Sequence, residues 1–243
     1  MRSISTLLMI MITGVLMAQT PVNKSYEVKA GNRISLRFDY PELVRISTWD
    51  RNEISITGTV SINGGENDRA FELNQSASGN TMFIENRING LKELPHRITI
   101  TRGSEKITFK SKADYRKYCE ETGHDYNIRS MGVDMDIVLE VKVPRNVETK
   151  LECVYGMAEV RNFNGPLSVD ATYGGVDVAV QEKTTGELIA ETSYGQIYTN
   201  LELKFSGLEE RDFHTQVSVK PGTGPRYSFE SKYGNVYLRK ATN

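Results

Sequence analysis

Residues 151–160 read LECVYGMAEV, and this phrase recurs three more times before the end of the chain. The other copies are VDATYGGVDV from Val169, AETSYGQIYT from Ala190 and FESKYGNVYL from Phe229. Each copy centres on a Tyr-Gly pair, and the four pairs are Tyr155-Gly156, Tyr173-Gly174, Tyr194-Gly195 and Tyr233-Gly234. Successive tyrosines are 18, 21 and 39 residues apart, so the last interval is close to two periods. A period of about 20 residues is typical of a solenoid, in which no repeat buries its apolar face alone.

The repeat alternates with the period of a β-strand, whose side chains point to opposite faces in turn. Positions two, four and six residues before each Tyr are mostly apolar or small, so they are predicted to face inward. After each Gly the apolar positions shift to three and five residues beyond the Tyr, as in Val176 and Val178. This shift predicts a corner between two short strands, where Gly would tolerate a positive φ. Equivalent tyrosines would then form one ladder along the axis.

The pattern predicts an all-β fold, a single-stranded β-solenoid (β-helix-like) with short coils of about 20 residues and one short helical insertion. We expect a signal peptide at 1–18, an N-terminal β region at 19–143 and C-terminal solenoid repeats, continuous with it, at 144–243. Residues 201–225 hold the interval without a Tyr-Gly pair, so they are predicted to form a degenerate coil with an exposed loop at 207–212.

The helical insertion is expected at residues 111–122. Tyr115, Tyr118 and Cys119 recur there at helical spacing, with Ser111 and Asp114 as a capping box and Gly123 as the stop.

The first 18 residues resemble an export signal, with a short positive start, an apolar run and a small residue, Ala18, at the cleavage position. That run is too short to span a bilayer comfortably, and the rest of the chain holds no longer one, so no transmembrane segment is expected after cleavage. The 30 basic and 31 acidic residues nearly balance. A nucleic-acid partner is therefore not expected, because such proteins usually carry a basic stripe.

An acidic residue lies three positions before the Tyr of every copy. These acids are Glu152, Asp170, Glu191 and Glu230, and two further acids, Glu159 and Asp177, follow the first two tyrosines by four positions. Like charges stacked on neighbouring strands repel, so the row requires solvent, interleaved bases such as Lys150 and Lys232, or a bound cation. The sequence leaves two alternatives open, an ordinary solvated face and a binding stripe for calcium or a basic partner.

No standard catalytic or metal-binding motif is present. The group nearest to a metal site is Cys119-Glu120-Glu121 with His124-Asp125, but its spacing fits no usual zinc site. Asp134 and Asp136 share a strand face and could imitate the paired carboxylates of a glycosidase. Trp49, the only Trp, is expected to cover the end of a coil rather than to stack on a sugar. We therefore expect no cofactor and no catalytic residue.

The chain has two cysteines, Cys119 and Cys153. In an exported protein they could form a disulfide, but Cys153 falls on the inward parity and could equally be a small buried residue.

These motifs resemble those of bacterial exported proteins grouped as putative adhesins of the domain-of-unknown-function type, similar to the head domains of putative autotransporter adhesins. The resemblance rests on residues 46–54 (ISTWDRNEI), the Tyr-Gly copies and residues 231–240 (SKYGNVYLRK). It implies a β-solenoid without catalytic residues, acting at the cell envelope.

Together, the sequence and the resemblance predict an extracytoplasmic, non-catalytic protein, periplasmic, surface-exposed or secreted. It would act as an adhesin or scaffold that binds an envelope polysaccharide or protein. Two alternatives are a polysaccharide-active enzyme on a β-helix and an envelope sensor that presents a surface to a regulatory membrane protein.

Overall fold

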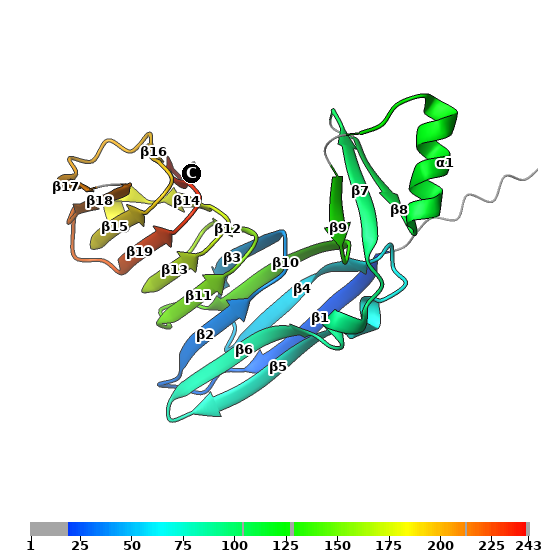
Figure 1. Cartoon of the computed structure of the whole chain (residues 1–243). Coiled ribbons are helices and arrows are strands. Elements are labelled where there is room, and N and C mark those ends of the chain that lie inside the picture. Colours follow the sequence, from blue (N-terminus) through cyan, green and yellow to red (C-terminus); the bar gives the residue numbers. More distant parts are fainter. Residues whose placement is uncertain (1–18, 104, 127–128, 212, 242–243) are drawn as a thin grey trace, which may run out of the picture.

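The computed structural model describes residues 19–103, 105–126, 129–211 and 213–241 (Figure 1). The expected export signal, residues 1–18, lies outside this part of the chain. The described chain is all-β, with two large sheets packed face to face and one small sheet that carries a helix. The all-β prediction is therefore confirmed.

The strands of the three sheets are given in spatial order. The first large sheet comprises β1 (Thr20–Glu27), β4 (Glu53–Ile62), β10 (Met135–Pro144), β3 (Leu43–Trp49), β12 (Met157–Val160), β14 (Val176–Val180), β20 (Val236–Lys240) and β16 (Ile197–Thr199). The second comprises β17 (Ser206–Arg211), β18 (His214–Val219), β15 (Glu187–Thr192), β19 (Arg226–Ser231), β13 (Leu167–Ala171), β11 (Thr149–Cys153), β2 (Arg33–Phe38), β6 (Thr81–Ile88) and β5 (Phe71–Ser78). The small sheet comprises β8 (Glu105–Phe109), β7 (Arg97–Arg102) and β9 (Arg129–Gly132).

The helical elements are few and short. They are α1 (Lys112–Thr122) and the 3₁₀ turns η1 (Asp68–Ala70), η2 (Leu91–Glu93) and η3 (Glu182–Thr184).

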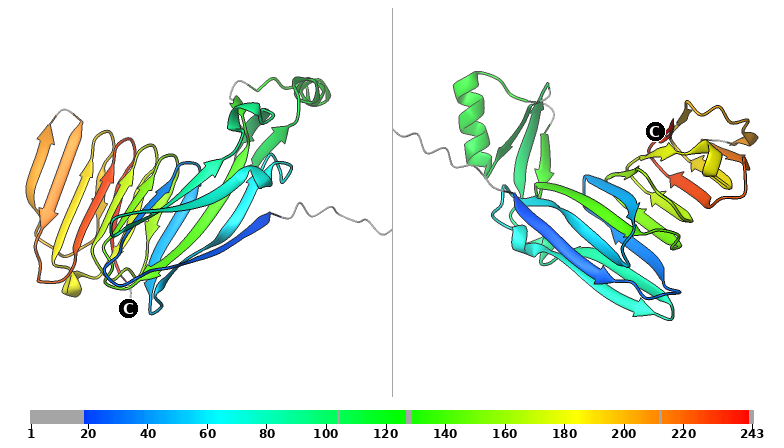
Figure 2. Two further views of the ribbon diagram at one scale, coloured as in Figure 1. Left: turned by 90° about the horizontal axis from the view of Figure 1, so that it is seen from below. Right: turned by 180° about the vertical axis from the view of Figure 1, so that it is seen from behind.

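Each Tyr-Gly copy forms one strand in each large sheet, joined by a corner. In the first copy, β11 lies in the second sheet and β12 in the first, and the other copies repeat this arrangement (Figure 2). The copies pair in parallel and in register, so Leu151 lies beside Val169, and Val169 beside Phe229. These three side chains are almost fully buried between the sheets. The alternation in the sequence therefore predicted the core face of these three strands correctly, whereas Thr199 in the third copy, also predicted to face inward, is exposed.

The spatial order of the copies differs from their order in the sequence. The last copy, β19 and β20, lies between the second copy and the third rather than beyond the third. Buried hydroxyls hold it there: Ser231 Oγ donates to the carbonyl of Gly174 at 2.8 Å, and Thr192 Oγ1 donates to the carbonyl of Gly234 at 2.8 Å. The expectation that neighbouring copies follow one another along the chain is wrong at this point.

Residues 201–225 do not form the predicted degenerate coil. They hold an antiparallel hairpin, β17 and β18, and β18 pairs antiparallel with β15 at the end of the second sheet. The loop expected at 207–212 is therefore mostly strand, since β17 runs from Ser206 to Arg211. With this hairpin covering the edge of β15, the chain returns to place its last two strands further inside the sheets.

The N-terminal half departs further from a single-stranded solenoid. Strands β1, β4 and β10 pair antiparallel, as do β5 and β6, so both large sheets are mixed. Strands β2 and β3, which precede the repeats, are connected in the same way as the two strands of a copy. They pair in parallel with β11 and β12, respectively. The parallel stack therefore begins with a segment that contains no Tyr-Gly pair.

The glycines at the corners are required for a different reason from the one predicted. None of Gly156, Gly174, Gly195 and Gly234 has a positive φ. Instead, a Cβ on Gly174 would lie 1.9 Å from the carbonyl oxygen of Gly156, and one on Gly195 would lie 1.9 Å from that of Gly234. Each glycine allows the adjacent backbone to approach closely, and this column of contacts follows the same spatial order as the strands.

The small sheet and α1 form a unit that stands away from the two large sheets in Figure 1. Its core is separate, with Ile98, Ile100 and Tyr115 buried together. The predicted helix is present: the Ser111 side chain caps it by accepting a hydrogen bond from the Asp114 amide, and it ends at Gly123 in the left-handed conformation.

Candidate functional site

A ladder of six aromatic rings runs across the parallel strands at the corner of the stack. Its spatial order is Tyr40, Tyr155, Tyr173, Tyr233, Tyr194 and Phe213. Adjacent ring centroids are 5.1 to 5.9 Å apart, and adjacent planes are within 24° of parallel. Five of the six side chains are exposed, from 45% for Tyr233 to 78% for Phe213. We name this feature the aromatic ladder.

The backbone positions these rings. Parallel strands place equivalent residues one strand spacing apart, about 4.8 Å, which is close to the spacing of offset-stacked rings. Nearly parallel rings with centroids this close must stack at least partly face to face, because two rings lying in one plane at this separation would clash. Each interior ring therefore uses its two faces on its neighbours and presents its edge and hydroxyl to solvent. Only the terminal rings have a face that is not covered by another ring of the ladder.

Sequence comparison of the copies found four of the six rings. Tyr40 was not found because its segment lacks the Tyr-Gly pair. Phe38 pairs with Cys153, and Tyr40 lies two residues beyond Phe38 as Tyr155 lies two residues beyond Cys153, so the two tyrosines are equivalent. Phe213 escaped it because it lies in the turn of the β17 and β18 hairpin, with φ of 76°. A positive φ strains a bulky residue, so the turn holds this ring on the end of the ladder at an energetic cost.

A shorter ladder lies on the first sheet, where Tyr198 stacks on Tyr237 with centroids 5.2 Å apart. The guanidinium of Arg239 lies 5.3 Å from the Tyr237 ring centroid. This pair is a natural point of comparison for the aromatic ladder.

The predicted acidic residues divide between the two sheets. Four of them form a row on the second sheet, in the order Glu152, Asp170, Glu230 and Glu191. Each acid lies three residues before its tyrosine, on the strand that leads into the corner, so the acidic row runs beside the aromatic ladder at a distance of roughly 10 Å. Glu159 and Asp177 lie side by side on neighbouring strands of the first sheet. The single acidic stripe expected from the sequence is therefore two separate features.

Interleaved bases neutralise much of both features. Lys150 Nζ lies 2.7 Å from a Glu152 carboxylate oxygen and 3.0 Å from one of Asp170. On the first sheet Arg161 pairs with both Glu159 and Asp177. The sequence predicts that Lys232 neutralises the acidic row, but its Nζ lies 5.5 Å from the centroid of the Tyr233 ring instead.

Glu230 is the exception in the acidic row. Within the described part of the chain no basic side chain lies within ion-pair distance of it, and it is flanked by Asp170 and Glu191 on the neighbouring strands. Partial burial, followed by repulsion from Glu191 and then from Asp170, raises the pKa of Glu230 above its ordinary value. Among the residues described, no group of three or more His, Cys, Asp or Glu side chains is arranged to hold a metal ion.

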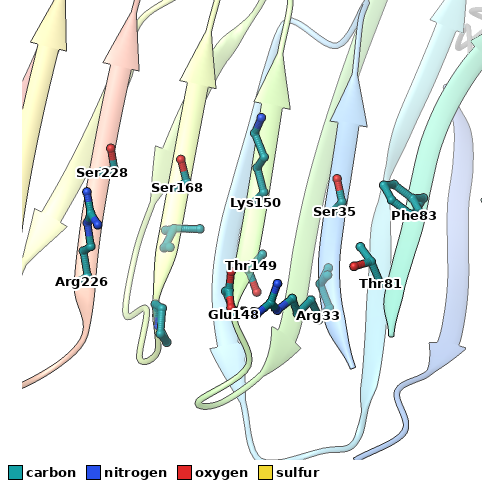
Figure 3. A pocket seen from close by; sticks show the side chains of 13 residues that line it. Arg33, Ser35, Thr81, Phe83, Glu148, Thr149, Lys150, Ser168, Arg226 and Ser228 are labelled. Carbon is teal, nitrogen blue, oxygen red and sulfur yellow. Dashed lines mark ion pairs between the residues drawn. The ribbon is translucent and has the colours of Figure 1, made fainter. Parts of the chain in front are cut away.

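A shallow groove of about 530 Å³ crosses the same outer face of the second sheet (Figure 3). Its floor includes the short side chains of Ser35, Ser168 and Ser228, which occupy one register position on neighbouring strands together with Lys150. Phe83 stands at one end and is 39% exposed. The acidic row separates this groove from the aromatic ladder, so three parallel bands run along the stack.

The cations at the groove are also paired. Arg33 Nε lies 3.1 Å from a Glu148 carboxylate oxygen, and Arg226 Nε lies 3.3 Å from Glu187. The groove is therefore mixed in charge, and its hydrogen-bonding groups lie beside apolar side chains such as Phe83 and Pro166.

The other residues considered from the sequence do not converge on a site. Asp134 forms an ion pair with Lys106 at 2.6 Å, whereas Asp136 accepts a hydrogen bond from Gln19. Trp49 donates from Nε1 to the carbonyl of Glu53, and the Arg51 guanidinium lies 4.8 Å from its ring centroid. This arrangement agrees with a packing role for Trp49.

The two cysteines are not joined. Cys119 packs in the core of the helical unit and Cys153 in that of the large sheets, and both are free thiols. Burial raises the pKa of the Cys153 thiol to about 12. Cys119, Glu120, His124 and Asp125 line one groove at the end of α1.

No family model matches this chain, and no curated protein sequence matches it. Two solved structures are similar in part. A putative cell adhesion protein from Clostridium sporogenes aligns with 92% of this chain and 100% of its own at 12% identity, with a TM-score of 0.45. A putative adhesin from Bacteroides fragilis aligns with 93% of this chain and 100% of its own at 10% identity, with a TM-score of 0.20. Both scores are below the level that indicates a shared fold. Within the described residues, no helix is long and apolar enough to cross a membrane.

Proposed function

We propose that this protein is a non-catalytic binding protein, an adhesin or scaffold that holds an extended polymer along its stacked strands. The single observation that carries the proposal is the aromatic ladder, whose exposed rings have no role in closing the core. Soluble proteins seldom expose a continuous row of large aromatic side chains unless it contacts a partner. In this proposal the parallel part of the chain acts as a short β-solenoid, a rigid scaffold that presents a linear surface.

A polysaccharide of the cell envelope is the partner that the surface fits best. Tyrosine hydroxyls repeat at the strand spacing along the ladder, and Ser168 and Ser228 place hydroxyls on adjacent strands in the groove, so both sets can hydrogen-bond successive units of an extended chain. The apolar ring edges can contact the carbon-hydrogen faces of sugars. A protein surface is the other partner expected from the sequence. The expected export signal places both in an extracytoplasmic compartment.

The proposal can be tested by binding to purified envelope polysaccharides and to a glycan array. We expect the wild-type protein to bind at least one polymer class, and the Tyr173→Ala, Tyr233→Ala double variant to lose roughly tenfold or more in affinity. Tyr198→Ala, in the short ladder on the other sheet, is the matched control and should bind as the wild type does.

Calcium is tested in the same experiment. Binding that disappears with a chelator and in the Asp170→Asn, Glu230→Gln variant would support a cation in the acidic row. Binding of the double tyrosine variant at wild-type affinity would overturn the proposed role of the ladder. Release of shortened or modified polysaccharide would instead support the alternative of an enzyme.

A further inference from the structure

We propose that the aromatic ladder is also a site for flat, elongated, positively charged aromatic molecules, which bind lengthwise along the ring edges beside the acidic row. This inference rests on the same ladder as the proposed function, but it does not depend on a polymer being the natural partner.

The interior rings of the ladder stack through their faces and are exposed at their edges. Tyr155, Tyr173, Tyr233 and Tyr194 stack at 5.1 to 5.2 Å, with planes within 10° of parallel, so their faces lie against one another. A ring edge can pack edge-to-face against the π face of another ring, and the preference for a cation comes from the acidic row, because the edge is the positive part of the quadrupole. A planar conjugated molecule laid along the ladder can therefore make an edge-to-face contact with each ring that it crosses.

The ladder is long and one ring wide. Its four tyrosines repeat at a nearly constant 5.1 to 5.2 Å because parallel strands pair at a fixed spacing. A compact ligand can contact only one or two of its rings, whereas a long rigid one contacts several without losing internal freedom. Length and rigidity are therefore the features that this surface favours.

Acidic side chains flank the ladder along one side. Asp170, Glu230 and Glu191 occupy consecutive strands beside the ladder. Lys150 is shared between Glu152 and Asp170, and His214 Nδ1 lies 3.6 Å from Glu191. Glu230 has no basic partner among the described residues. Lys232 Nζ lies 5.5 Å from the Tyr233 ring centroid, so the four acids of the row face two lysines, Lys150 and Lys232. The excess of acids leaves the surface beside the ladder negative and favours cations over anions of the same shape.

The short ladder on the first sheet differs from the aromatic ladder in length and charge. The Tyr198 and Tyr237 pair has the same ring spacing, 5.2 Å, but only two rings, and the Arg239 guanidinium lies over Tyr237. It lacks the length of the aromatic ladder, and its acidic neighbour, Asp177 on the strand beside Tyr237, is paired with both Arg161 and Arg239. Variants of this pair are therefore matched controls for ring loss without loss of the site.

Thioflavin T, a flat cationic dye, is a suitable probe, and Congo red is a flat anionic counterpart. We expect thioflavin T fluorescence to rise on titration with the folded full chain. Tyr173→Leu and Tyr233→Leu should each weaken binding roughly tenfold, because each interrupts the ladder near its middle. Tyr198→Leu should leave the affinity for thioflavin T unchanged. Asp170→Asn with Glu230→Gln should weaken it roughly threefold, and added salt should weaken it too.

The proposal is overturned by any of three results: no thioflavin T binding, equal binding by Tyr173→Leu and wild type, or equal affinity for Congo red. If a leucine variant in the middle of the ladder fails to fold by circular dichroism, Phe213→Leu serves instead. Phe213 is 78% exposed in a turn, so its removal shortens the ladder without touching the core, and dye binding should weaken severalfold. Because polysaccharide binding is measured separately, failure here leaves the proposed function intact, and the reverse also holds.

Discussion

The ring of Tyr233 stacks on that of Tyr173 with centroids 5.2 Å apart and planes 6° from parallel. Sixty residues of sequence separate the two, and the third copy of the repeat, with Tyr194, lies between them in the chain. On its other face Tyr233 stacks on Tyr194 at 5.1 Å. The last copy is therefore enclosed by two earlier ones, which makes the end of the chain part of the interior of both sheets.

This order can be tested by cross-linking. Asp170 pairs directly with Glu230, whereas Glu191 lies one strand further away. In a Cys119→Ser, Cys153→Ala background, Asp170→Cys with Glu230→Cys should form a disulfide readily, because directly paired Cα atoms are within about 6 Å. Asp170→Cys with Glu191→Cys should not, because two strand spacings of about 4.8 Å exceed that reach. Mass spectrometry after mild oxidation gives the answer, and cross-linking of only the second pair would show the sequential order instead.

The corner glycines should not tolerate a side chain. A Cβ at Gly174 would lie 1.9 Å from the Gly156 carbonyl oxygen, so Gly174→Ala must push two copies apart. We expect the free energy of unfolding to fall by about 3 kcal/mol in urea titrations. Gly132→Ala, where a Cβ meets nothing within 4 Å, is the control and should change it little. A wild-type urea midpoint for Gly174→Ala would contradict the close approach.

Rings in the middle of the ladder should stabilise the fold more than the ring at its end. Tyr233→Ala removes two stacking contacts and Phe213→Ala removes one. At roughly 1 kcal/mol for each stacked pair, the losses should be about 2 and about 1 kcal/mol. Thermal and urea unfolding of both variants provide the comparison. Equal losses would mean that the rings do not act as a continuous stack.

Glu230 should make stability depend on pH. The pKa of Glu230 is raised in the folded state, so the folded protein binds its proton more tightly than the unfolded chain does. Its contribution to stability is therefore fully present below the unfolded pKa and is lost as pH rises through the folded pKa. Glu230→Gln should raise the free energy of unfolding at pH 7 and flatten its slope above pH ~4. Glu72→Gln, an exposed acid on β5, is the control, and a variant that is less stable than wild type at pH 7 would refute this reading.

The two thiols should differ in reactivity. Cys153 is 2% exposed with a pKa of about 12, so it should react with Ellman's reagent only when the large sheets open. Cys119 is half-buried on α1 and should react in the native protein. We expect one thiol to react in buffer and two in guanidinium chloride. Detection of a Cys119–Cys153 disulfide in the purified protein would contradict the separation of the two cores.

The sequence by itself determined the local structure of the repeats. Alternation identified inward-facing residues such as Leu151, Val169 and Phe229, and the capping residues Ser111 and Gly123 marked the ends of the helix. These features depend on backbone geometry and on the solvation of neighbouring side chains, which a few adjacent residues specify. The four tyrosines of the ladder and the acids beside it were found in the same way.

Tertiary structure alone decided how the copies are ordered and what each surface contains. All copies share one period and one inward pattern, so local preference does not distinguish Tyr233 beside Tyr173 from Tyr233 beyond Tyr194. The choice depends on long-range contacts, such as the bonds from Ser231 to Gly174 and from Thr192 to Gly234. The same pairings bring Tyr40 and Phe213 onto the ladder and leave Glu230 without a basic partner in the described chain. The sequence pattern determines which side chains of each strand point inward, whereas the neighbours of that strand depend on how the whole chain pairs its strands in the two sheets.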